Sequence, residues 1–293
     1  MLVGLAVLVG LAGLVTACGG GNSDRGRSGE KVRVVAAFFP LAEAVRNVGG
    51  GRVTVTDLTP AGAEPHDLEL TTEQVDAIQD ARLVVVLGGG FQPAIEKAAR
   101  QRDGTTLTVL ARAGAHGSDP HVWLDPVRMA GIVTDVGQTL AEVDPAGRAV
   151  YEQHSAAYRA RLVQLDVRYR AGLARCARRT IVTGHAAFGY LARRYGVRQE
   201  GVAGISPDAE PDPRRLAELA DLVRREHVTT VFTEALVSPK VAEALAREAG
   251  GVRTEVLDPL EGLTEEERAA GDDYVRVMEV NLARLERALG CSV

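Results

Sequence analysis

Three histidines and one aspartate stand where they could bind a metal ion, because each follows a predicted strand. His66 and His121 follow the second and fourth predicted strands, and His185 and Asp258 follow the fifth and the last. Imidazoles combined with a carboxylate suit borderline divalent ions, zinc above all. The four residues are far apart in the sequence, so they could form a site only in the folded chain. The pattern predicts a site for a borderline divalent ion, above all Zn²⁺.

His121 lies in the stretch Asp-Pro-His-Val-Trp-Leu-Asp-Pro, residues 119–126. Each Asp-Pro pair favours a turn, because proline fixes its own φ and restricts the residue before it. If the chain between the pairs is extended, His121, Trp123 and Asp125 share one face. Asp125 is expected to cap a helix that begins at Pro126. We therefore expect a rigidly held histidine, with Trp123 in the wall of the site.

The remaining candidates have weaker patterns. Glu234 ends a predicted strand, and we expect it to accept a hydrogen bond from a ligand histidine. A fifth ligand or a residue at the start of a helix are the alternatives for Glu234. His116, His154 and His227 are expected to be solvated surface residues, with a weak secondary metal contact as the alternative for His116.

Composition bounds the class of protein. The chain has 293 residues, 46% of them hydrophobic and 25% charged, with a formal net charge of −5. These values suit a globular protein of one large or two ordinary domains. A mildly acidic chain has no basic footprint for nucleic acid.

The N-terminus has the pattern of an export signal. Residues 2–15 are an apolar run, shorter than the roughly 20 residues that span a bilayer. Small residues follow it, so we interpret 1–17 as a cleaved signal peptide, with a buried N-terminal helix as the alternative. Cys18 resembles the acylated cysteine of a bacterial lipobox. Residues 18–30 then form a flexible tether, which would hold the protein on the outer face of the cytoplasmic membrane.

Export also bears on the other two cysteines. Cys176 and Cys291 would be in a compartment that permits disulfides, and both fall near predicted helix ends. We hypothesise a bridge between them.

Strands and helices alternate twice along the chain. This α/β pattern predicts parallel sheets in two lobes, residues 31–144 and 178–293. Between them, 145–177 has helical spacing without proline after Pro145, which predicts a rigid linking helix of about 30 residues, roughly 45 Å long. Parallel sheets bind ligands at the carboxyl ends of their strands, so the metal site is expected in the cleft between the lobes.

The chain resembles a known family, the zinc- and manganese-type solute-binding lipoproteins of bacterial ABC importers, especially the high-affinity zinc-uptake binding proteins. The segments that carry the resemblance are 63–69, 119–126, 183–190, 232–234 and 256–260. They run in the family order over nearly the whole mature chain. Carried over by position, the family's metal ligands fall on His66, His121, His185 and Asp258.

The resemblance implies a binding protein and not an enzyme. It would bind Zn²⁺, or Mn²⁺, outside the membrane and deliver it to a permease and its ATPase, and we expect a monomer. Manganese-type members tend to have a carboxylate where this chain has His185, which favours zinc. Many zinc-uptake members carry a long His- and acid-rich loop, whereas residues 114–118 are short and hold only His116.

Three other functions compete with this interpretation. A zinc hydrolase would need an open coordination position and a base, for which Glu64, Asp67 or Glu234 are available, but a fourth protein ligand closes the site. A surface adhesin with a structural metal is compatible with the sequence. A receptor for a siderophore or similar chelate would need a wider cleft lined by arginines or aromatic residues.

Overall fold

The computed structural model describes Met1 and residues 31–66, 68–115, 117–207 and 212–292. The chain divides into two units, Met1–Glu30 and Lys31–Val293, and all the described strands and helices lie in the second. The predicted signal peptide, the tether, Cys18 and His116 lie outside the described residues. Within the described segments, none of the helices has both the length and the apolar character needed to cross a membrane.

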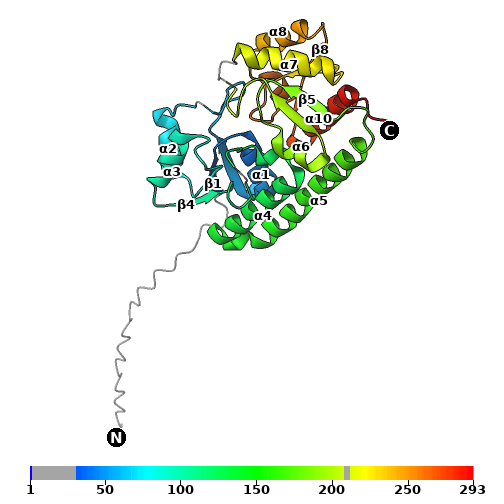
Figure 1. Cartoon of the computed structure of the whole chain (residues 1–293). Helices are drawn as coiled ribbons and strands as arrows, with labels where there is room; N and C mark the ends of the chain where they lie inside the picture. Colours follow the sequence, from blue (N-terminus) through cyan, green and yellow to red (C-terminus); the bar gives the residue numbers. More distant parts are fainter. Residues whose placement is uncertain (2–30, 67, 116, 208–211, 293) are drawn as a thin grey trace. The chain divides into compact units, whose positions relative to one another are not determined.

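Two parallel sheets of four strands form the framework of the fold (Figure 1). Their strand orders are β2-β1-β3-β4 and β6-β5-β7-β8, so the same topology occurs twice. The strands are β1 (Val32–Ala36), β2 (Val53–Asp57), β3 (Leu83–Val86), β4 (Thr105–Thr108), β5 (Thr180–Thr183), β6 (Arg198–Gly201), β7 (Thr230–Thr233) and β8 (Arg253–Val256). The predicted fold class, two α/β lobes with parallel sheets, is confirmed.

The helices connect and cover these strands. They are α1 (Phe39–Gly49), α2 (Thr72–Asp80), α3 (Pro93–Arg100), α4 (Pro126–Val143), α5 (Arg148–Gly172), α6 (Gly189–Tyr195), α7 (Pro213–Arg225), α8 (Lys240–Glu248), α9 (Glu265–Ala270) and α10 (Tyr274–Leu289). Short 3₁₀ turns are η1 (Gly50–Arg52), η2 (Val122–Leu124) and η3 (Pro145–Gly147). Local sequence sets the helix starts: Thr71 begins α2 in a capping box with Gln74, because each side chain bonds the other residue's backbone N–H.

The linking helix α5 packs against α1 and α4 of the first lobe and α10 of the second (Figure 1). It buries the side chains whose spacing predicted it: Tyr151, Tyr158, Leu162, Leu165 and Tyr169. The Tyr169 hydroxyl donates to the backbone oxygen of Met278 on α10 at 2.7 Å. At 25 residues, α5 is shorter than expected, which corresponds to about 38 Å.

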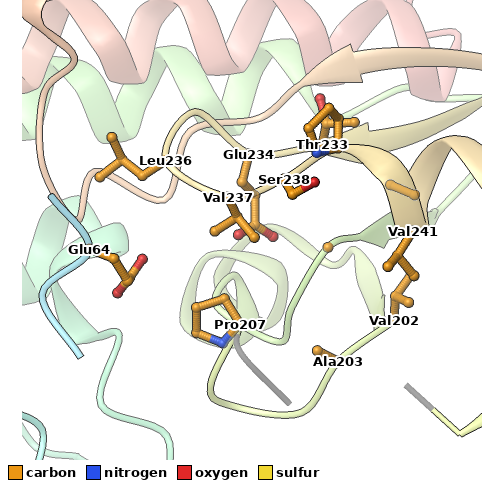
Figure 2. A pocket seen from close by; sticks show the side chains of 13 residues that line it. Glu64, Val202, Ala203, Pro207, Thr233, Glu234, Leu236, Val237, Ser238 and Val241 are labelled. Carbon is orange, nitrogen blue, oxygen red and sulfur yellow. The ribbon is translucent and has the colours of Figure 1, made fainter. Parts of the chain in front are cut away.

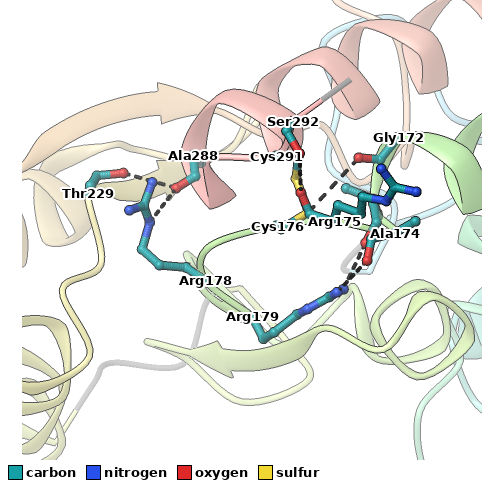
Figure 3. Close-up of a disulfide and its surroundings, with 11 residues drawn as sticks. Gly172, Ala174, Arg175, Cys176, Arg178, Arg179, Thr229, Ala288, Cys291 and Ser292 are labelled. Carbon is teal, nitrogen blue, oxygen red and sulfur yellow. Dashed lines mark hydrogen bonds between the residues drawn. A yellow bond between two sulfur atoms is a disulfide. The ribbon is translucent and has the colours of Figure 1, made fainter.

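The helix stops early because the next segment pairs with the C-terminus (Figure 3). Cys176 and Cys291 form a disulfide with an S–S distance of 2.02 Å. The N–H groups of Ala177 and Arg178 donate to the backbone oxygens of Gly290 and Leu289, at 3.2 and 3.0 Å. These bonds need an extended chain, so the segment that follows α5 leaves the helix before Cys176.

The core runs through both lobes. In the second sheet the side chains alternate: Ile181 and Phe232 belong to the cluster that also contains the first sheet, and Val182 and Val231 belong to a separate cluster with α7 and α8. Because one apolar cluster contacts both sheets, it fixes the carboxyl ends of their strands relative to each other.

The stretch 119–126 is not extended. The N–H groups of Leu124 and Asp125 donate to the backbone oxygens of His121 and Val122, both at 3.3 Å, and form η2. The predicted shared face of an extended strand is therefore wrong. The predicted cap is confirmed: the Asp125 carboxylate accepts from the N–H groups of Val127 and Arg128 and begins α4.

Candidate metal centre

Four side chains converge at the carboxyl ends of four strands. His66 follows β2, His121 follows β4, His185 follows β5 and Glu261 follows β8. One ligand atom from each lies within 4.8 Å of the other three. Two of the residues come from each lobe, so the group exists only when both lobes are folded and packed together.

The spacing of these atoms suits a tetrahedral ion. The Glu261 Oε1 atom lies 3.3, 3.1 and 3.3 Å from the Nε2 atoms of His66, His121 and His185. The Nε2 atoms of His121 and His185 are 3.3 Å apart. A tetrahedral zinc ion with bonds of about 2.0–2.1 Å separates its ligand atoms by about 3.3 Å. The group therefore has the dimensions of a four-coordinate zinc site.

Asp258 has a different position from the one expected for a ligand. Its Oδ1 atom accepts from the N–H of Leu260 at 2.7 Å, and its backbone exchanges two hydrogen bonds with the Asn281 side chain. Leu260 has φ 54°, a left-handed conformation that is rare for a non-glycine residue. The resulting turn directs the next side chain, Glu261, toward the three imidazoles. Asp258 thus builds the turn, and the carboxylate among the imidazoles is that of Glu261.

In two of the three imidazoles, a carboxylate contacts the Nδ1 atom, on the side of the ring away from the centre. Asp119 Oδ1 lies 2.9 Å from His121 Nδ1 and also accepts from the His121 backbone N–H at 3.0 Å. Glu234 contacts the Nδ1 atom of His185 at 2.5 Å and accepts from its backbone N–H at 2.7 Å. A carboxylate acceptor places the proton on Nδ1, which leaves the Nε2 lone pair facing the centre.

The second lobe also supports Asp119. The Tyr190 hydroxyl, from α6, donates to the backbone oxygen of Asp119 at 3.2 Å. Arg193, one helical turn along, lies 3.7 Å from its carboxylate. The orientation of His121, a residue of the first lobe, thus depends on contacts with the second lobe.

Aromatic rings close the side of the centre that faces the first lobe. The Trp123 ring lies 5.1 Å from that of His121, and its Nε1–H donates to the Pro259 oxygen at 2.8 Å. The Phe91 ring lies 4.5 Å from that of His66. Trp123 is fully buried and Phe91 is 6% exposed, so this side of the centre is covered by apolar rings.

The electrostatics suit a site that exchanges protons for a cation. Burial raises the pKa of Glu261, but hydrogen bonds to His121, His185 and His66 outweigh it and hold this pKa well below its usual value. Burial lowers the pKa of His185, but hydrogen bonds to Glu234 and Glu261 raise it to about 10. The pKa of His121 is also raised, because bonds to Asp119 and Glu261 outweigh burial. An ionised carboxylate among imidazoles is the charge arrangement that binds a divalent metal ion.

A family model described as the periplasmic component A of the zinc-uptake complex, ZnuA, matches residues 34–288. The chain belongs to the ZnuA family.

Relatives of known name agree with this membership. The high-affinity zinc uptake system protein ZnuA of Bacillus subtilis (strain 168) is 35% identical in a comparison that covers 98% of this chain and 97% of that protein. The zinc-binding lipoprotein AdcA of Streptococcus pneumoniae (strain R6) is also 35% identical over 90% of this chain, which spans only 57% of AdcA. The crystal structure of the Zn(II)-bound ZnuA-like domain of that species' AdcA is 37% identical, with a TM-score of 0.76 over 88% of this chain and 99% of the domain.

In this member of the ZnuA family, the structure brings together His66, His121 and His185 of the predicted ligand set and places Asp258 outside the group. Glu234 contacts His185, and Trp123 packs against His121. His154 and His227 are also outside the group.

Sequence reasoning missed two residues, Glu261 and Asp119. Glu261 is three residues beyond Asp258, and nothing in the sequence distinguishes the two carboxylates without the turn at Leu260. Asp119 was detectable: it precedes His121 by two residues, close enough to bond both the ring and the backbone N–H.

Proposed function

We propose that this chain is the extracytoplasmic receptor of an ABC importer, which binds one Zn²⁺ ion between its two lobes and delivers it to the membrane permease. The convergence of three Nε2 atoms on Glu261 Oε1, at 3.1–3.3 Å, carries this proposal. Membership of the ZnuA family supports it.

We propose His66, His121, His185 and Glu261 as the ligands, with Glu234 and Asp119 as the acceptors that orient two of them. Asp258, the carboxylate expected from the sequence, is the alternative fourth ligand. Three imidazole nitrogens favour zinc over manganese, because manganese prefers oxygen ligands.

The proposed partners are the permease and its ATPase, and the proposed form is a monomer attached to the membrane through a lipid on Cys18. The relative AdcA is named a lipoprotein, and the family is described as periplasmic. These two descriptions support a location outside the cytoplasm, on the outer face of the cytoplasmic membrane.

The geometry argues against a zinc hydrolase. A catalytic zinc ion keeps one coordination position for water or substrate, whereas four protein side chains converge here. His121, His185 and Glu261 are each at most 1% exposed, so a peptide or ester substrate would not reach the ion. An adhesin role would be an addition to metal binding and not a replacement for it.

The decisive experiment compares the two carboxylates. Protein stripped of metal by a chelator should take up about one Zn²⁺ per chain, measured by calorimetry against a competing chelator and by metal analysis. Glu261→Gln should weaken binding about 100-fold, because it removes the charge at the centre. Asp258→Asn is the matched control: its side-chain oxygen can still accept from Leu260, so we expect a change of less than about tenfold.

The reverse order of effects would make Asp258 the fourth ligand. A wild-type chain that takes up no zinc would disprove the receptor function. Growth of cells under zinc limitation, with and without the gene, tests delivery separately from binding.

A further inference from the structure

A cavity of about 310 Å³ lies beside the metal centre. It is lined by 13 residues, among them Glu64, Gly184, Val202, Pro207, Glu234 and Val237, and is called the side pocket below. Glu64 comes from the first lobe and the other lining residues come from the second. In Figure 2 the Glu64 carboxylate faces the hollow from its own loop, and Glu234 reaches it from the loop after β7. The side pocket is therefore bounded by both lobes.

The two carboxylates of the side pocket contact two different imidazoles of the centre. Glu234 contacts Nδ1 of His185 at 2.5 Å. Glu64 Oε1 accepts from the His66 backbone N–H at 3.1 Å and lies 4.0 Å from His66 Nε2. The four converging residues do not line the side pocket, and Glu64 and Glu234 connect it to the imidazoles.

The exposure of the four converging residues is uneven. The side chains of His121 and His185 are 0% exposed and that of Glu261 is 1% exposed. The His66 side chain is 10% exposed and the Glu64 side chain 19%. Among the described residues, no hydrogen bond is made by Nδ1 of His66, in contrast to the other two imidazoles. The accessible side of the centre is the His66 side, next to Glu64.

We propose that the ion reaches and leaves the centre through the side pocket, and that the Glu64 carboxylate receives it there. This inference rests on the proposed function. Apart from Glu64 and Glu234, the walls are mostly apolar, with Val202, Pro207 and Val237 among them. Apolar walls screen charges weakly. A divalent cation that has lost part of its hydration shell between them is therefore stabilised strongly by a nearby negative charge. The Glu64 side chain is 19% exposed and that of Glu234 is 1% exposed, so Glu64 is the carboxylate that an entering ion meets first, and its role is in the rate of binding.

The experiment is stopped-flow mixing of ZnCl₂ with the metal-free full-length chain. Trp123, the only tryptophan, lies 5.1 Å from the His121 ring and serves as the fluorescent reporter. Glu64→Gln keeps an oxygen that can accept from the His66 N–H and removes only the charge. We expect association to slow about three- to tenfold and to depend less on salt concentration. Glu69→Gln, an exposed carboxylate outside the pocket, is the matched control and should retain the wild-type rate.

A second variant tests the route itself. Val237→Phe fills part of the side pocket and should slow association and chelator-induced dissociation by the same factor, which leaves the Kd unchanged. Val163→Phe, at a 51% exposed position on α5, should change neither rate.

Equal association rates for Glu64→Gln and Glu69→Gln would overturn the role of Glu64. Wild-type rates in Val237→Phe would overturn the route. Either result would leave the equilibrium uptake of zinc, and with it the proposed function, intact. A wild-type chain that binds no zinc would overturn both.

Discussion

His121 and His185 are held from behind by carboxylates in fully buried surroundings, whereas His66 lies between the Phe91 ring and solvent. The conformations of His121 and His185, in the loops after β4 and β5, are restricted, because Asp119 and Glu234 each bond both the ring and the backbone of one histidine. In the loop after β2, the His66 backbone N–H donates to Glu64 and the Nε2 atom contacts Glu261, but among the described residues no carboxylate contacts its Nδ1 atom.

The difference indicates a division of labour within one centre. The two buried imidazoles and Glu261 form a fixed half-site, because their orientation is set before any ion arrives. His66 completes the site from the accessible side. A binding protein needs both properties, since a site closed on all sides could hold an ion but would exchange it slowly.

The largest expected effect comes from the fixed half-site. His185→Ala should weaken Zn²⁺ binding by about 1,000-fold, about 4 kcal/mol, because it removes a buried ligand and leaves the Glu234 Oε2 atom without its imidazole partner. His66→Ala should cost about 10- to 100-fold, because water can occupy a missing position on the accessible side. Calorimetry with a competing chelator measures both. Equal losses in the two variants would remove the distinction between the two sides.

An intermediate effect is expected from the acceptors behind the imidazoles. Glu234→Gln and Asp119→Asn should each weaken zinc binding about 10- to 100-fold, as is typical when the hydrogen-bond partner of a ligand histidine is changed. For both variants we expect the loss of zinc affinity to come at least as much from faster zinc dissociation as from slower association. Glu64→Gln, in contrast, should act mainly on association. Zinc affinities within twofold of wild type in both variants would show that the bonds do not orient the ligands.

The smallest expected effect is the change in stability of the metal-free protein with each pH unit. The pKa of His185 is raised in the folded, metal-free protein from 6.5 to about 10. Its protonated form therefore stabilises the fold fully below pH 6.5, and this stabilisation is lost as the pH rises toward 10. The Tm of the metal-free protein should fall over that interval. The Tm of the zinc-loaded protein should not fall in this way, because the ion has replaced the proton.

The same proton affects binding. Zinc affinity should rise with pH by up to about tenfold per unit for each proton displaced. Calorimetry in buffers with different ionisation enthalpies counts the protons released. Glu234→Gln should flatten both pH profiles, and profiles identical to wild type would show that the His185–Glu234 bond does not control the proton.

The position of each secondary-structure element was largely predictable. Apolar runs such as Leu83–Val86 and caps such as Asp125 are local signals, because side-chain burial and backbone hydrogen bonds at these sites depend on neighbouring residues. The length of α5 was overestimated, since its end is set by pairing of the Cys176 segment with the Cys291 segment, 115 residues away. The geometry of residues 119–126 was missed because the alternation of side chains favours an extended strand, whereas the backbone forms the turn η2 and Trp123 bonds the distant Pro259 oxygen.

The sequence alone determined that three histidines follow the carboxyl ends of parallel strands, and that such strands come from two lobes. Only the tertiary structure decided which carboxylate joins them. Asp258 and Glu261 are equivalent as residue types, and the choice depends on the left-handed turn at Leu260 and on the pairing of the Asp258 backbone with Asn281. A turn of that kind is held by contacts with a distant helix, and no local pattern of residues specifies it.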